Sequence, residues 1–169
     1  MATAKSVEIT ALDASPREVL ETGSLEGRMR VASGTIAAGT GDIDNDDVLM
    51  MVQIPSNAKV LSIKLFNDDL DSNGSPSLAA NVGLYYENGT VIDEDCYASA
   101  ITTLQAAETT GAEVAFEARN VNAVSNFAWE DGGLSTDPGG ALRIALTMSN
   151  AAATAAAGDV TLIVTYVVD

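Results

Sequence analysis

Several stretches of this chain alternate apolar and polar side chains with a period of two, and this feature restricts the fold most. Residues 59–66, KVLSIKLF, carry aliphatic side chains at every second position. The same alternation runs through residues 141–148, ALRIALTM, and residues 159–168, DVTLIVTYVV. A strand has this period because successive side chains point to opposite faces of a sheet. The chain is therefore predicted to be rich in half-buried strands.

Turn residues such as Asn88-Gly89 separate these runs, and patterns with a helical period are short, at residues 95–104 and 122–131. Six to eight strands without a βαβ rhythm predict an all-β fold. The expected form is an antiparallel β-sandwich of jelly-roll-like type with one or two short helices, and the strand order stays open. Further strands are predicted at residues 47–55, 81–87, 111–119 and 27–36, the last with Met29 and Val31 facing the core.

The first 26 residues show no sustained period of either kind. Pro, Gly, Ser and charged residues surround four isolated apolar positions there. A poorly ordered leader is one interpretation, and an extended arm that becomes ordered on a neighbouring subunit is the other. We favour the arm, which gives an arm over residues 1–26 and a sandwich domain over residues 27–169. The apolar positions of the arm, Val7, Ile9, Leu20 and Leu25, are candidate protein contacts.

The composition removes several classes of function. The 169 residues include no His, which excludes Ser-His and Cys-His nucleophile pairs and imidazole metal ligands, and we predict no enzyme. Cys96 is the only cysteine, so no internal disulfide can form. The formal net charge of -16 opposes binding to nucleic acid or to anionic membranes. Because no long apolar run resembles a signal peptide or a membrane span, we expect a protein made in a cytoplasm.

An acidic stretch, residues 66–78, contains the spacing Asp69-x-Asp71-x-Asn73 that opens an EF-hand calcium loop. The twelfth position counted from Asp69 is Ala80, so the closing bidentate carboxylate is absent. Predicted strands flank the loop, whereas an EF-hand requires helices. An acidic hairpin loop is therefore favoured and no cofactor is predicted, although a calcium site stays open as the alternative.

Outside the arm, the candidate contact residues are small or basic. Residues 150–159, NAAATAAAGD, link the last two predicted strands through small side chains only. They form either a loose tip or a close-packing surface for another protein, with Ala153 and Ala155 as the candidates. Arg119 and Arg143 are the basic candidates, on a face of the predicted sandwich.

Four segments keep a characteristic order along the chain: VQIPSNAKVLSIKLFNDDL, NVGLYY, VIDEDCYASAITTL and STDPGGALRIALTMSNAAATAAAGDVTLIVTYV. In this order the chain resembles small virion structural proteins of tailed, often marine, bacteriophages. The resemblance implies a protein of the capsid surface, most simply a decoration or cement protein that binds the major capsid protein. It also implies an oligomer around a symmetry axis, for which a homotrimer is expected.

Two alternatives from other classes remain open. One is a β-sandwich module of a tail or head fibre that binds host-surface glycan, with loops held by calcium. The other is a hydrolase built on Asp93 and Asp95, because paired carboxylates perform acid and base chemistry on glycosides. The chain has a single Trp as an aromatic platform for a sugar, so a solvated turn is the favoured interpretation of these two carboxylates.

Overall fold

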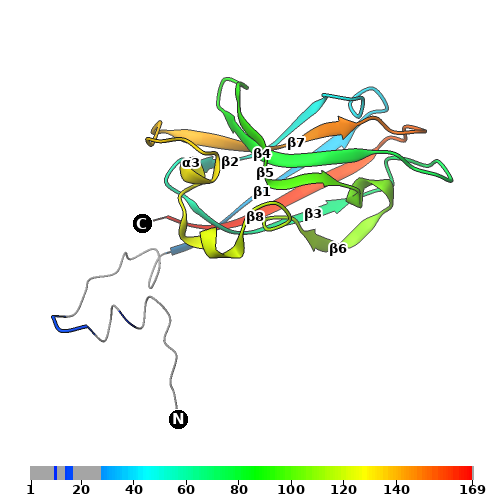
Figure 1. Ribbon diagram of the computed structural model, residues 1–169. Coiled ribbons are helices and arrows are strands. Elements are labelled where there is room, and N and C mark those ends of the chain that lie inside the picture. Colours follow the sequence, from blue (N-terminus) through cyan, green and yellow to red (C-terminus); the bar gives the residue numbers. More distant parts are fainter. Residues whose placement is uncertain (1–9, 11–13, 17–27, 169) are drawn as a thin grey trace, which may run out of the picture.

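Eight strands form two antiparallel sheets in the part of the chain that the structure describes (Figure 1). The computed structural model describes residue 10, residues 14–16 and residues 28–168. The sheets have the strand orders β1-β8-β3-β6 and β2-β7-β4-β5. The strands are β1 (Arg28–Ala38), β2 (Val48–Pro55), β3 (Lys59–Asn67), β4 (Ala79–Tyr86), β5 (Val91–Ile101), β6 (Glu108–Glu113), β7 (Ala141–Asn150) and β8 (Gly158–Val168).

The strand pairing is nested. The first strand pairs with the last, β2 with β7, β3 with β6, and β4 with β5. This is the pattern of one long hairpin rolled into two Greek keys, which defines a jelly roll. The predicted antiparallel β-sandwich is confirmed, and the jelly-roll arrangement is the one observed.

The core lies between the two sheets and consists mainly of aliphatic side chains. In β8 the alternation places Val160, Leu162 and Val164 in the interior, fully buried. Leu142 and Ile144 of β7 meet them from the opposite sheet, also fully buried. Each such side chain contributes roughly 1.5–3 kcal/mol by leaving water. The period of two is therefore the direct cause of the two-layered body.

The two ends of the jelly roll differ in which connections they carry. One end, here the loop end, holds the β1–β2, β3–β4, β5–β6 and β7–β8 connections. The other, here the arm end, holds the start of β1, the end of β8 and the three remaining connections. In Figure 1 the arm end is on the left and the loop end on the right.

The first strand differs from its prediction in which face it buries. Met29 and Val31 were expected in the core, but both are exposed on β1. Their partners on β8 are Val167 and Thr165, whereas Ala32 pairs with the buried Val164. The even-numbered side chains of β1 therefore point toward the core side of the sheet. The prediction was wrong because residues 29–36 carry apolar side chains in both phases.

Two close backbone approaches explain glycines within strands. A Cβ atom at Gly34 of β1 would lie 2.1 Å from the carbonyl oxygen of Met51, so only glycine lets β1 cross β2 here. A Cβ atom at Gly83 of β4 would lie 2.2 Å from the carbonyl oxygen of Asp93. The register of β5 shifts beside this residue, and its backbone folds onto β4.

Three predicted elements have different extents. Residues 95–104, predicted helical, belong to β5 and to the one-turn helix η1 (Thr103–Gln105). The strand predicted at residues 111–119 ends at Glu113, whose carboxylate accepts N–H groups from Ile63 and Ala115 and so takes the place of a ladder partner. Residues 122–131 form short helices, η2 (Val121–Ser125) and α3 (Ala128–Asp131). No helix within the described residues is long and apolar enough to cross a membrane.

Candidate interaction surfaces

The loop end is held together by the carboxylate of Asp71, which is 1% exposed. Its Oδ1 accepts the backbone N–H of Thr154 at 2.9 Å. Its Oδ2 accepts the N–H groups of Ser77 at 2.7 Å, Leu78 at 3.1 Å and Ala153 at 2.9 Å. An ionised carboxylate offers about four lone-pair sites, so these donors saturate it. One side chain thus joins the β3–β4 connection to the β7–β8 connection.

The calcium-like spacing has a local structural explanation. Asp69 Oδ1 accepts the N–H of Asp71 at 3.1 Å, Asp71 Oδ1 that of Asn73 at 3.4 Å, and Asn73 Oδ1 that of Ser75 at 2.9 Å. These are successive Asx turns, in which a side chain binds the backbone two residues on. Asx turns and calcium loops share the spacing of two because each brings oxygens to one side of the chain. The favoured interpretation as an acidic loop therefore agrees with the geometry, but the expected hairpin was wrong, because the flanking strands β3 and β4 belong to different sheets.

The environment of Asp71 keeps it charged. Burial alone raises the pKa of a carboxyl group, but the N–H groups of Thr154, Ala153, Ser77 and Leu78 stabilise the anion. Their combined effect holds the pKa of Asp71 well below its usual range. Within the described residues, no group of three or more acidic or cysteine side chains is arranged to hold a metal ion.

The contacts of Asp71 hold the small residues of the β7–β8 connection in place. Ala153 is exposed, and its N–H donates to Asp71. Ala155 is half-buried, packs on the core and forms an isolated bridge with Asp71. The tip is therefore attached to the neighbouring loop, and a contact role for Ala153 and Ala155 stays a prediction.

Carboxylates dominate the loop end. Among the described residues, no Lys or Arg lies in its four connections, and Lys64 is in the middle of β3. The other described basic residues, Arg28, Arg30, Lys59, Arg119 and Arg143, all lie toward the arm end. The basic side chains are therefore polarised along the molecule, whereas carboxylates lie at both ends, with Glu87, Glu117 and Glu130 among those of the arm end. The carboxylates of the loop end are Asp42, Asp44, Asp46, Asp47, Asp68, Asp69, Asp71, Glu108 and Asp159.

Arg119, a predicted contact residue, lies inside the protein. Its side chain is 4% exposed and forms an ion pair of 2.6 Å with Asp131. A second nitrogen, Nη2, donates to the carbonyl oxygen of Val60 at 2.8 Å. The guanidinium also lies 5.1 Å from the ring centre of Tyr97 and 4.5 Å from that of Phe116. Arg119 thus joins the β6–β7 connection to the sandwich and does not reach the surface.

The pKa of Asp131 is shifted in the opposite direction to that of Asp71. Burial is the main influence and raises its pKa to about 6, while the charge and hydrogen bond of Arg119 oppose the rise. Its side chain is 1% exposed. Arg119 offers it one close contact, whereas Asp71 receives a full set of N–H donors. The number of hydrogen bonds to the anion therefore decides the direction in which each buried carboxyl group titrates.

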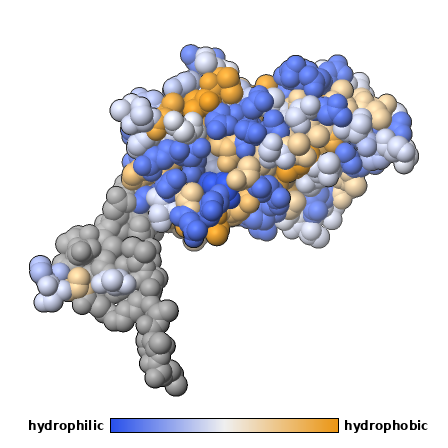
Figure 2. Space-filling view, viewed as in Figure 1, coloured by the Kyte–Doolittle hydropathy of each residue, from blue (hydrophilic) through white to orange (hydrophobic). Residues whose placement is uncertain are grey.

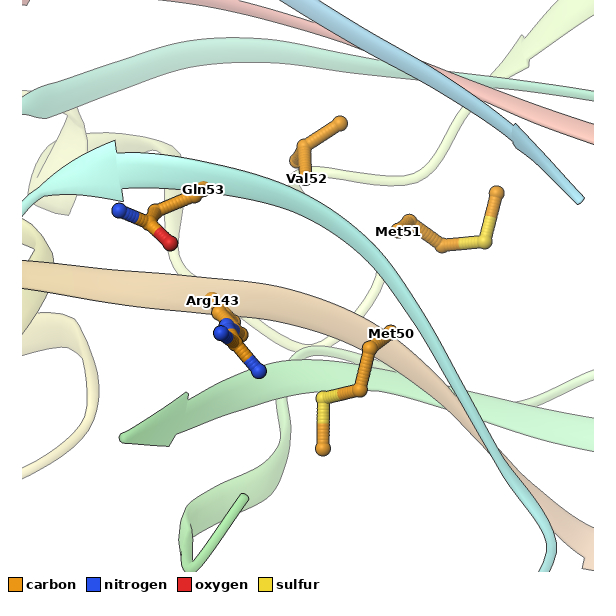
Figure 3. A pocket seen from close by; sticks show the side chains of 5 residues that line it. All are labelled: Met50, Met51, Val52, Gln53 and Arg143. Carbon is orange, nitrogen blue, oxygen red and sulfur yellow. The ribbon is translucent and has the colours of Figure 1, made fainter. Parts of the chain in front are cut away.

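Arg143, the other basic candidate, is half-buried on β7 and lines a shallow pocket of about 200 Å³. Figure 3 shows that the lining side chains come from the adjacent strands β2 and β7. The pocket is smaller than the roughly 300–1,000 Å³ of typical ligand sites. Arg143 has no ion partner among the described residues, although Gln53 beside it donates to Glu87 at 3.1 Å. The guanidinium is therefore available to a partner.

The carboxylates Asp93 and Asp95 lie on β5, so the prediction of a turn was wrong. The N–H of Asp95 donates to Asp93 at 3.2 Å, and the hydroxyl of Ser99 donates to Asp95 at 3.0 Å. Burial and the adjacent Asp95 carboxylate raise the pKa of Asp93. Burial, followed by the charge of Asp93, also raises the pKa of the Cys96 thiol well above its usual value. A thiol in this environment is a poor nucleophile.

Exposed apolar side chains gather toward the arm end, a feature that the sequence analysis missed. Met29 is 69% exposed and Val31 62%, with Val121 at 64% and Val91 at 49%. Val48 at the loop end is 36% exposed. The two apolar phases in residues 29–36 were the available signal, because a strand that buries one face leaves the other phase in water. Val7, Ile9, Leu20 and Leu25 of the predicted arm lie outside the described residues.

Comparisons with known proteins give matches among solved structures. No protein-family model matches the chain, and no curated protein matches it. The chain is similar to a chain of the capsid asymmetric unit of cyanophage Pam1, at 26% identity and a TM-score of 0.64, and the match covers 93% of this chain and 97% of that one. It also resembles a chain of the capsid of Ralstonia phage GP4, at 20% identity and a TM-score of 0.63, over 85% of this chain and 86% of that one.

The second match shows a shared fold, and the first extends along almost the whole of both chains. The predicted resemblance to structural proteins of bacteriophage virions is confirmed by the first match. That match supports a structural role in a virion.

Proposed function

We propose that this chain is a bacteriophage decoration or cement protein, which binds the outer surface of the capsid and stabilises it through protein-protein contacts. The similarity to a chain of the Pam1 capsid carries the proposal. Because the match covers 93% of this chain and 97% of the other, it concerns two small proteins of nearly the same extent. A small rigid domain of this kind is suited to bridging larger shell subunits.

The physical properties of the molecule support this role. A shell under internal pressure gains stability when many copies of a protein bind its assembled form and not its separated subunits. Each contact of standard size buries about 1,200–2,000 Å². The saturated carboxylate of Asp71 and the ion pair between Arg119 and Asp131 hold connections at both ends of the jelly roll. The role requires no catalysis, and we propose none.

The partner in this proposal is the major capsid protein, and the decoration protein itself forms a homo-oligomer, with a trimer as the expected state. The segment 1–26 acts as an arm that extends each contact beyond the jelly roll. It precedes β1, which is an edge strand of its sheet. The acidic surface limits aggregation of particles and contact with nucleic acid.

Binding of the purified protein to shells assembled without it tests the proposal. Gel analysis of sedimented shells should show a copy number comparable with that of the shell subunit. The temperature at which the shells disrupt should rise with occupancy. A few copies per particle would instead indicate a tail or portal component, and lack of binding would contradict a decoration role.

Deletion of residues 1–25 tests the arm. The truncated protein should keep its cooperative unfolding, because the core of the described body contains none of these residues. Its attachment to shells should weaken. Attachment equal to that of the full chain would show that the arm is not a contact element.

A further inference from the structure

The start of β1 combines exposed apolar side chains with cations that have no internal partner. Met29 is 69% exposed and Val31 62%. Arg28 and Arg30 alternate with them on the opposite, even-numbered face of the strand and are also exposed, and neither guanidinium has an ion partner among the described residues. We name these four consecutive residues the β1 patch. Its apolar side chains lie on the outer face of β1 and its guanidinium groups on the opposite face, so apolar and cationic groups remain available on the two sides of the strand.

The sheet topology keeps the β1 patch accessible. Among the described residues β1 pairs with β8 alone within its sheet, which leaves its other edge unpaired by any of them. The strand contacts β2 near Gly34, where the backbones meet closely, whereas the β1 patch lies three or more residues before that crossing. Figure 1 shows β1 emerging from the body at the arm end. A partner that covers this edge can therefore reach the side chains on both faces of the segment.

The chemistry of the surrounding surface is asymmetric. Exposed Val91 and Val121 lie toward the same end of the molecule, as does Arg143, which has no ion partner within the described part of the chain. Figure 2 shows strongly apolar atoms in the half of the molecule next to the grey trace. The loop end has nine carboxylates, and its connections have no basic side chain among the described residues. The arm end also has carboxylates, such as Glu87 and Glu117, but it alone combines exposed apolar side chains with several arginines.

Charge decides which partner fits the β1 patch. The same patch of a second copy would set Arg28 and Arg30 against identical guanidinium groups, which is unfavourable. A carboxylate matches a guanidinium by two parallel hydrogen bonds. Met and Arg are enriched at protein interfaces, with the apolar groups at the centre and the polar groups at the rim. The complementary surface is therefore apolar and bordered by carboxylates.

From these observations we infer that the β1 patch docks on an apolar surface of the shell protein bordered by carboxylates, so that the acidic loop end points away from the shell. The inference rests on the proposed decoration role and adds to it the orientation of the molecule and the chemistry of the partner. It assigns binding to residues 28–31 of the body, independently of the segment that precedes them.

The test uses full-length variants and shells that lack the protein. The double variant M29S/V31S removes the apolar part of the patch, and Arg30→Glu reverses one charge. Their matched controls at the loop end are Val48→Ser and Asp44→Lys. Co-sedimentation over a range of protein concentrations gives the Kd, at low salt and at high salt.

Both patch variants should weaken binding about tenfold or more, as loss of central interface residues does. Both loop-end controls should stay within about twofold of wild type. Higher salt should weaken wild-type binding more than binding of Arg30→Glu, because salt screens the lost ion pair. Unfolding temperatures near that of wild type would show that the variants are folded.

Four outcomes would overturn the inference, and they are distinguishable. Patch variants that bind as wild type, or loop-end variants that lose binding, would contradict the orientation while leaving the decoration role in place. A change of subunit number in M29S/V31S by light scattering, with shell binding kept, would identify a second copy as the occupant. If wild-type protein does not bind shells, the proposed function itself fails.

Discussion

The loop end and the arm end of the jelly roll differ in whether their polar groups find partners within the protein. At the loop end, Asp71 receives N–H groups from two connections, and Asp69 and Asn73 receive further ones. At the arm end, Arg28 and Arg30 are exposed and have no ion partner among the residues that the structure describes. Groups that are satisfied internally make a surface rigid and leave little for a partner, whereas unsatisfied groups beside exposed apolar side chains retain binding capacity.

The buried carboxyl groups at these ends show the same contrast. Asp71 is charged because backbone donors surround it, and Asp131 is raised in pKa because burial outweighs its one ion pair. Each holds a connection to the sandwich, the first through hydrogen bonds to the backbone and the second through Arg119. The loop end and the arm end should therefore respond differently to mutation and to pH.

The largest effect is expected from Asp71→Ala. It leaves the N–H groups of Ser77, Leu78, Ala153 and Thr154 without their acceptor at once. The Tm should fall by about 10 °C or more by calorimetry. Asp69→Ala is the control, because this exposed side chain accepts one N–H, and its Tm should fall by about 3 °C at most. Equal effects of the two variants would contradict the assignment of Asp71 as the residue that joins the loops.

The next effect concerns the internal arginine of the arm end. Arg119→Met should lower the free energy of unfolding by about 3–5 kcal/mol, because it leaves the Asp131 carboxylate buried without its partner. The matched variant Arg143→Met removes the same group from a half-buried position and should change stability by about 0.5 kcal/mol or less. Urea denaturation at pH 7 measures both. Similar losses would show that burial does not separate the two residues.

The pH dependence should have opposite signs for the two carboxyl groups. The folded-state pKa of Asp131 is raised to about 6, above its unfolded value near 4, so its contribution to stability falls as pH rises from about 4 to 6. Two pKa units correspond to about 3 kcal/mol, and screening by nearby solvent reduces the expected loss to about 1–2 kcal/mol. The pKa of Asp71 is lowered, so its contribution is present above about pH 4 and is lost below it.

Denaturation curves from pH 2.5 to 7 test this prediction. The decline between pH 4 and 6 should be absent in Asp131→Asn, which cannot titrate at this position. The decline below pH 4 should persist in that variant. A decline between pH 4 and 6 that survives in Asp131→Asn would assign it to another group.

The smallest effect on stability is expected at the β1 patch. The variant M29S/V31S should change the Tm of the free protein by about 2 °C or less, since both side chains are already in water. Val164→Ser, on the buried face of the neighbouring strand, should cause a far larger fall, because it removes a fully buried side chain and places a hydroxyl in the core. Calorimetry of the free protein compares them. A large fall for the patch variant would mean that the free chain already covers these residues.

Much of the fold could be predicted from the sequence because half-buried strands alternate apolar and polar side chains with a period of two. Residues 59–66, 141–148 and 159–168 were predicted as strands and coincide with β3, β7 and β8 to within a few residues. Residues 95–104 were not, because Ala, Ser and Leu at that spacing also fit a helix, and the pairing of β5 with β4 overrides the local preference. Which phase of β1 faces the core depends on its register with β8, a property of two distant segments.

The contact and binding residues were harder to assign from sequence. Arg119 looked like a surface cation because sequence shows its charge and not its burial between Asp131, Val60 and two rings. The acidic loop resembled a ligand set because the donors that satisfy Asp71 come in part from residues 153 and 154, about eighty positions away. Such partners have no local signature.

By itself the sequence determined that the chain is a two-layered β protein, because alternation sorts side chains between core and water without reference to distant residues. It also determined the acidic charge and the absence of histidine chemistry. Tertiary structure alone decided the strand order, the partners of Asp71 and Arg119, and the exposure of Met29 and Val31. These depend on which segments meet, and long-range contacts are set by the packing of the whole chain.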